Sequence, residues 1–329
     1  MRFLLDDQQR EFARSLDCML TAAGTPAVVR AWSAGDHGPG RALWARLAEA
    51  GVFALAVPEE YDGLGPRPVE LAVAFTELGR HAVPGPLVET VAAAALLDRL
   101  DDATLATDWL PGIASGKTAA SLCLLTPDSP YALDADAADV VLVVTGDAVR
   151  VAESVGPAQP SADPARRLAR PLGGTVLARG PHVSAAAERA ADIAALATAA
   201  QALGLGRALL DRTVDHVRRR TQFGRPIGSF QAVKHRLADV LIALEFAQPL
   251  VHAAAVAVAA GRPDGARDIA AAKVAAGEAA YGAARTALHC HGALGYTEEL
   301  DLSLWIRKAR PLRTAWGTPA SCRARVLPG

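Results

Sequence analysis

Residues 218–235 read RRRTQFGRPIGSFQAVKH and carry the strongest local signals in the chain. A helical pattern ends in three arginines, the chain turns through Gly224 and Pro226, and a second helical pattern begins after Ser229. Guanidinium groups at a helix end present fork-shaped donors that match phosphate oxygens. Cationic side chains at a helix end also complement its dipole while they face water. From its chemistry, the turn is suited to an anion.

The residues on either side of this turn follow helical spacing. Two long segments, at about 230–260 and 264–291, follow the turn. Such helices in succession favour an antiparallel bundle. We therefore predict a C-terminal helical bundle domain over residues 184–329, with four helices. Before the turn, apolar residues recur at steps of three and four with one longer gap, at Ile193, Leu196, Ala200, Leu203, Leu210, Val214 and Val217.

Residues 119–183 have a different pattern. Short β-branched runs occur at 140–144, 149–151 and 176–177, and turn residues separate the first two. We predict a small β domain here, with residues 139–144 and 148–151 paired as a hairpin. Residues 1–118 read as helices broken by a Gly/Pro loop at 57–66, which predicts an N-terminal α-helical domain. The predicted fold is mainly α with a small β middle domain.

Composition limits the classes of partner. A chain of 329 residues favours two or three packed units over one core. The formal net charge of −1 gives no indication of nucleic acid or of a polybasic membrane patch. Apolar stretches such as Leu250–Ala260 read as too short to span a bilayer. The cysteines lack metal-ligand spacing, and the N-terminus does not read as a signal peptide. We expect a cytoplasmic protein without a metal, a membrane or nucleic acid.

Three segments resemble the acyl-CoA dehydrogenase family. Residues 220–231, RTQFGRPIGSFQ, are similar to the family segment RxQFGxPIxxFQ. Residues 56–65, AVPEEYDGLG, resemble its N-terminal loop and are followed by ELGR at 77–80. Residues 291–299, HGALGYTEE, resemble its HGGxGYT segment. The three matches occur in family order, and no GxGxxG follows a strand, so a nicotinamide cofactor on a Rossmann fold is not expected.

The resemblance implies FAD, bound largely across a subunit interface. It places Arg220 on the pyrophosphate, with Gln222, Phe223 and Gln231 at the other FAD-contacting positions of the segment. Gly292 and its neighbouring backbone match the segment that lies along the adenine-side pyrophosphate, and His289 falls in the same region. Two residues depart from the family pattern there. His289 stands where glutamine is usual, and Ala293 replaces a glycine whose bare backbone would approach the phosphates.

The catalytic carboxylate of the family has no counterpart in this sequence. The chemistry implied is removal of the α proton of an acyl-CoA by a carboxylate, while the β hydrogen leaves as hydride to the flavin. Residues 313–318 read RTAWGT, so Trp316 falls on the usual glutamate, and an indole cannot accept a proton at neutral pH. The alternative family position holds Ala194 and Ala195. Asp192 lies two residues earlier, and we expect an exposed aspartate at a helix start. The catalytic residues therefore remain unknown.

These departures favour a subunit that supplies half of a site. The β region is also short, because residues 125–131, LTPDSPY, lead almost directly to the strands. We expect a heteromeric α2β2 enzyme in which a second acyl-CoA dehydrogenase-like subunit keeps the glutamate and the flavin-facing loop. The resemblance implies an acyl-CoA substrate, fatty or steroid, and an electron-transfer flavoprotein or similar acceptor. Two alternatives stay open: a self-sufficient homomeric dehydrogenase with a relocated base, and a non-catalytic scaffold subunit.

Overall fold

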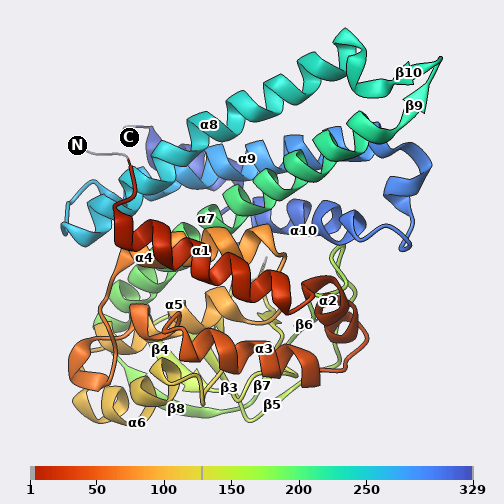
Figure 1. The fold of residues 1–329 in the computed structure, drawn as a ribbon. Helices are drawn as coiled ribbons and strands as arrows, with labels where there is room; N and C mark the ends of the chain where they lie inside the picture. The colour runs from red at the N-terminus through yellow and green to blue at the C-terminus, as the bar shows by residue number, and fades with distance from the viewer. Residues whose placement is uncertain (1–3, 127–128, 328–329) are drawn as a thin grey trace. The chain divides into compact units, whose positions relative to one another are not determined.

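The computed structural model describes residues 4–126 and 129–327 (Figure 1). Residues 127 and 128 of the short loop before the strands lie outside the described residues. The α-helices are α1 (Asp7–Ala22), α2 (Thr25–Ser33), α3 (Gly38–Glu49), α4 (Pro68–Arg80), α5 (Leu87–Arg99), α6 (Ala103–Ala114), α7 (His182–Arg219), α8 (Gln231–Ala259), α9 (Gly265–His291), α10 (Leu302–Thr314) and α11 (Pro319–Val326). The 3-10 turns are η1 (Ala54–Ala56), η2 (Glu59–Tyr61), η3 (Ile227–Ser229) and η4 (Gly292–Tyr296).

The strands lie between the two groups of helices in the sequence. A four-stranded sheet has the order β1-β3-β4-β8, formed by Ala120–Leu124, Val140–Thr145, Ala148–Val151 and Thr175–Arg179. Strands β1 and β3 are parallel, whereas β3–β4 and β4–β8 are antiparallel. Two small ribbons, β2–β6 and β5–β7, pair Ala132–Leu133 with Leu168–Ala169 and Ser154–Val155 with Pro171–Leu172. The hairpin predicted from the β-branched runs is therefore confirmed as β3–β4.

The chain forms two compact units. The first contains the described residues of 1–26, 72–82 and 195–329, and the second contains those of 27–71 and 83–194. In the second unit, α5 packs against β1 of the sheet. The Thr90 hydroxyl donates to the Ala120 carbonyl at 2.8 Å and accepts from the Ala120 amide at 3.0 Å, and Thr90 is fully buried. This pair of bonds satisfies backbone groups of a buried strand where a helix covers it.

The first unit is helical. Helix α9 packs against α8, α10 and α11, and Figure 1 shows α8 and α9 running alongside each other. Two glycines allow α4 and α7 to cross with their backbones in contact. A Cβ on Gly204 would lie 1.8 Å from the Thr76 carbonyl oxygen, and one on Gly79 would lie 2.0 Å from the Gln201 carbonyl oxygen. Larger residues cannot occupy these two positions unless the helices move apart.

Within the described part of the chain, two helices are long and apolar enough to cross a membrane by length and composition alone. The apolar window of α7 is 94% buried inside the protein, as expected of a core helix. The window of α8 is 39% buried. From the sequence, we expect apolar stretches such as Leu250–Ala260 to be too short to span a bilayer. For length this expectation is wrong, because that stretch belongs to α8, which has 29 residues. The mainly helical fold with a small sheet in the middle is confirmed.

Candidate functional site

The turn after α7 forms a tight hairpin. Strands β9 (Thr221–Gln222) and β10 (Arg225–Pro226) pair antiparallel, and Phe223 and Gly224 connect them. Both connecting residues are left-handed, with φ of 52° and 76°. Two positive φ values in succession are typical of a type I′ turn, which suits the twist of a two-residue hairpin. The hairpin projects from the end of the α7–α8 pair (Figure 1).

The hairpin presents an aromatic and cationic surface. The Phe223 side chain is 89% exposed, and its ring meets the edge of the Phe230 ring with centroids 6.1 Å apart. The Arg225 guanidinium lies 4.2 Å from the centroid of the Phe230 ring. Large apolar rings are seldom left bare on a surface without a use, and an exposed ring beside guanidinium groups suits a flat ligand with negative charge.

The end of α9 supplies a second backbone element. Helix α9 stops at His291, and Gly292 has φ of 60° and ψ of −136°, a conformation that L side chains rarely adopt. A Cβ built on Gly292 would meet nothing within 4 Å, so the backbone there is open to approach. The next residues form η4, in which Tyr296 is 74% exposed. An open glycine backbone after a helix is compatible with close contact to a phosphate.

Two histidines join these elements. His216 lies on α7, one turn before Arg220, which directly follows the helix. The ring of His216 stacks on the ring of His291 with centroids 3.9 Å apart and planes 27° apart. The His291 Nδ1 lies 2.8 Å from the Ala287 carbonyl oxygen. Burial lowers the pKa of His216, and His291, Arg220 and Arg219 lower it further. The stack therefore holds the arginine-bearing helix end beside the Gly292 segment.

All six predicted cofactor residues are exposed: Arg220, Gln222, Phe223, Gln231, His289 and Gly292. The structure places the first three at the hairpin, Gln231 at the start of α8, and the last two at the end of α9. Their chemistry fits the diphosphate end of a dinucleotide, because the set combines a guanidinium, amide donors and an open glycine backbone. The assignment of each residue to FAD stays a prediction. Sequence reasoning gave no role to His216, which is linked to this region by its stack on His291.

The position expected to hold the base is a fixed turn between α10 and α11. Trp316 is left-handed, with φ of 54°, and is half-buried. The fully buried ammonium of Lys273 donates to the carbonyls of Leu312, Arg313 and Gly317 at 3.0, 3.1 and 3.2 Å. A Cβ on Gly317 would lie 2.6 Å from the Cys322 sulfur. These contacts fix the backbone of the turn. The side chain that the turn carries is an indole, which has no proton-accepting atom at neutral pH.

Glu278 contacts both helices that flank this turn, but it is already paired with arginines. Glu278 of α9 accepts a hydrogen bond from Arg313 at 2.9 Å and another from Arg323 at 3.2 Å. The hydrogen bond from Arg313 is the main cause that lowers the pKa of Glu278, and the charges of both arginines add to it. A carboxylate with a lowered pKa and two guanidinium partners is a poor proton acceptor.

The prediction that Asp192 is an exposed aspartate at a helix start is wrong. Helix α7 begins at His182, so Asp192 lies within the helix, where it is half-buried. Burial lowers the pKa of Arg189, one turn earlier, and the charge of Asp192 opposes this shift. Ala194 and Ala195, at the alternative base position, are buried. An aspartate within the helix body and beside a cationic side chain is weakly suited to accept a proton from a substrate.

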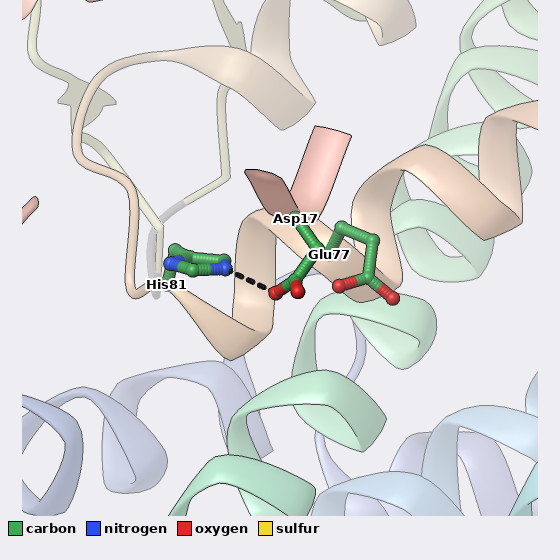
Figure 2. Close-up of side chains that lie close together, drawn as sticks. All are labelled: Asp17, Glu77 and His81. Carbon is green, nitrogen blue, oxygen red and sulfur yellow. Dashed lines mark hydrogen bonds and ion pairs between the residues drawn. The ribbon is translucent and has the colours of Figure 1, made fainter. Parts of the chain in front are cut away.

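Among the described residues, one group of side chains could hold a metal ion: Asp17, Glu77 and His81 (Figure 2). Their ligand atoms lie within 4.8 Å of one another, and His81 Nε2 lies 2.8 Å from Asp17 Oδ1. Burial raises the pKa of Glu77 to about 7 against the opposing charge of Arg80, whose Nε lies 3.6 Å from Glu77 Oε2. Because this guanidinium opposes a cation and the histidine already bonds Asp17, we interpret the group as a clasp between α1 and α4.

Comparisons with known proteins agree with this architecture. Residues 6–117 match the family "Acyl-CoA dehydrogenase, N-terminal domain", and residues 184–327 match "Acyl-CoA dehydrogenase, C-terminal domain". The chain is 37% identical to acyl-CoA dehydrogenase IpdE2 of Mycobacterium tuberculosis over 310 residues, which cover 92% of this chain and 91% of that protein.

Two solved structures are similar over nearly the whole chain. The ChsE4–ChsE5 complex of Mycobacterium tuberculosis has a chain that is 25% identical with a TM-score of 0.85, and the match covers 99% of this chain and 98% of that one. A glutaryl-CoA dehydrogenase of Mycobacterium smegmatis in complex with FADH2 shares the fold at 18% identity and a TM-score of 0.84, with 98% and 94% covered. On the extent of the IpdE2 match, this chain belongs to the acyl-CoA dehydrogenase family.

Proposed function

We propose that this chain is the base-lacking subunit of a heteromeric, FAD-dependent acyl-CoA dehydrogenase. It would bind the diphosphate end of FAD through the hairpin and the Gly292 segment, while a second acyl-CoA dehydrogenase-like subunit supplies the catalytic carboxylate. The reaction is α,β-dehydrogenation of an acyl-CoA thioester. The similarity to a chain of the ChsE4–ChsE5 complex supports an assembly of two different subunits.

The observation that carries this proposal is the turn at Trp316. An acyl-CoA dehydrogenase needs a carboxylate placed against the α proton, and a misplaced base contributes little. Here Lys273 fixes the turn that would present the base, and the turn presents an indole. Glu278, the acid that bonds residues of α10 and α11, is paired with two arginines. Proton removal is therefore assigned to the second subunit.

The residues of this chain would bind and orient the cofactor. Arg220 would bind the diphosphate with its fork of donors, and Gln222 and Gln231 would add neutral donors. Phe223 would cover an apolar face of the ligand or of the second subunit. FAD, when bound, supplies the acceptor for the β hydrogen. We further propose an electron-transfer flavoprotein or similar acceptor for the electrons and a cytoplasmic location, without a nucleic-acid or membrane partner.

The test is co-expression with a candidate second subunit. The chain would be purified alone and together with an acyl-CoA dehydrogenase-like polypeptide encoded beside it, and flavin would be measured by absorbance after release from the protein. We expect a stable yellow complex that oxidises acyl-CoA, and a lone chain with little flavin and no turnover. A chain that stays colourless and monomeric in every pairing would contradict the proposal.

Paired arginine variants test the site itself. Arg220→Ala should weaken FAD binding by about 10- to 100-fold, because a charge-assisted hydrogen bond contributes roughly 1.5–3 kcal/mol. Arg218→Ala removes the same charge from the same exposed helix end and should change the affinity much less. Equal effects of the two variants would argue against a specific role of Arg220. If Arg220→Ala loses neither flavin nor partner activity, the chain is a scaffold.

A self-sufficient homomeric enzyme would give a different experimental result. Stoichiometric FAD and brisk turnover by the lone chain would replace our proposal with a self-sufficient enzyme. Asp192→Asn should then abolish turnover if Asp192 were the relocated base. Because Asp192 lies within α7 beside Arg189, we expect this variant to leave turnover of the complex unchanged.

A further inference from the structure

The stack of His216 on His291 is the contact that connects the two halves of the candidate diphosphate site. The Arg220 amide donates to the His216 carbonyl at 2.8 Å within α7, so the position of His216 fixes the position of Arg220. His291 directly precedes Gly292, and its ring is held by the Ala287 carbonyl. Rings with centroids 3.9 Å apart are in close contact, so a shift of either helix end must move the other.

The groups that surround this pair are mainly cationic. On α7, Arg219 and Arg220 act on His216, and on α9 the charge of His291 acts on it. The Cys290 carbonyl is the group that favours protonated His216. On α8, Arg236 faces Cys290, whose thiol has a pKa raised by burial. Burial also lowers the pKa of His291. Burial and cationic neighbours therefore disfavour the protonated form of His216, and burial disfavours that of His291.

We propose that the His216–His291 stack positions Arg220 against Gly292 and takes up a proton when a diphosphate binds between them. The inference rests on the proposed function, because the diphosphate is that of FAD. The two histidines act through Arg220 and the Gly292 backbone and are positioning residues. A bound diphosphate would bring negative charge beside a pair whose present neighbours are positive, and it would thereby favour the imidazolium form.

The sign of the pH dependence follows from this linkage. The pair has a higher pKa in the diphosphate complex than in the free protein, so the complex holds more protons. Affinity is then greatest at acidic pH and weakens as the pH rises through the pKa of the complex. Within that window one linked proton changes the dissociation constant by up to about tenfold per pH unit. If binding does not change the protonation of His216 and His291, the two rings contribute no pH dependence to the affinity.

Calorimetry of FAD binding to the flavin-depleted two-subunit complex tests the inference. FAD would be titrated at pH 6, 7 and 8, and at pH 7 in two buffers of different ionisation enthalpy to count protons. We expect proton uptake and tighter binding at pH 6 than at pH 8. His216→Phe keeps a stacked ring without a titratable nitrogen. It should bind FAD at pH 8 nearly as the wild type does, with reduced proton uptake and a flatter pH profile.

The controls separate this inference from the proposed function. His216→Ala removes the ring and should weaken FAD binding at every pH, and His216→Phe should restore it. His235→Phe removes an exposed histidine of α8 and should keep the wild-type profile. One outcome is FAD binding that is tight and dependent on Arg220, with the same proton uptake in the wild type and in His216→Phe. That result would overturn the inference and leave the proposed function standing. If the wild type binds no FAD, the proposed function fails. Inorganic pyrophosphate that raises the pKa of the two rings in NMR titrations would then still support the pair, and unchanged ring pKa values would end it.

Discussion

Replacing Asp134 by asparagine should remove most of one pH-dependent contribution to the stability of the second unit. The Asp134 side chain is 1% exposed. Its Oδ1 accepts hydrogen bonds from Trp32 Nε1 at 3.3 Å and from the Arg167 amide at 3.1 Å. Burial raises the pKa of this carboxyl to about 7, and the two hydrogen bonds lower it only in part. The folded protein therefore binds a proton at Asp134 that the unfolded chain releases near pH 4.

The size of the effect follows from these two pKa values. Because the folded pKa is raised, the contribution is fully present below about pH 4 and is lost as the pH rises towards 7. The slope between these limits is about 1.4 kcal/mol per pH unit. From pH 5 to pH 8, the free energy of unfolding should fall by roughly 2.5 kcal/mol on account of this one group. Asparagine suits the site because it tolerates the left-handed backbone, where φ is 48°.

Urea unfolding at pH 5, 6, 7 and 8, followed by tryptophan fluorescence, measures the effect. The difference between the wild type and Asp134→Asn should change by roughly 2.5 kcal/mol across this range in favour of the variant at high pH. Glu77, whose pKa burial also raises to about 7, is present in both proteins and cancels in the difference. If the two proteins show parallel curves, Asp134 is not protonated in the folded state at pH 5 and the argument from burial is refuted.

Two further predictions concern the helical unit. Gly204→Ala should cost about 1–3 kcal/mol of stability, because its Cβ would overlap the Thr76 carbonyl oxygen, and thermal unfolding measures the loss. Gly282→Ala in α9 is the matched control: its Cβ would meet nothing within 4 Å, so it should stabilise the protein by up to about 1 kcal/mol. Lys273→Met should release the carbonyl of Gly317, and amide hydrogen exchange at residues 315–317 should speed up by at least about tenfold. Unchanged exchange there would mean that the turn is held by other contacts.

The elements that sequence could predict are those specified by local chemistry. Gly224 and Pro226 cannot continue a helix, so the end of α7, the turn and the start of α8 after Ser229 were all foreseeable. The hairpin β3–β4 followed from β-branched runs around a Gly-Asp turn. The start of α7 could also have been found, since Gly180 and Pro181 precede it and both are typical of a helix boundary. Placing that boundary correctly would have corrected the interpretation of Asp192.

The contacts that join distant residues had no sequence signal. His216 falls in a run of charged residues at a helix end, and nothing near it indicates that its ring will meet that of His291. Asp134 belongs to a run with Asp136 and Asp139 that reads as a polar loop, although Trp32 buries its carboxyl. Burial of a polar group depends on what the rest of the chain places above it, and local composition does not contain that information.

The hairpin at Phe223 and the turn at Trp316 are stabilised in different ways. The turn is closed by this chain alone, through Lys273 and through Glu278 with its two arginines. The Phe223 ring is 89% exposed, so free energy remains to be gained by covering it. A ligand or a second subunit that covers this ring would therefore stabilise the hairpin, whereas the turn already has its contacts within this chain. The left-handed backbone of Phe223 is strained, and strained residues of this kind cluster at functional sites. The exposed aromatic hairpin therefore favours a binding role for this end of the chain.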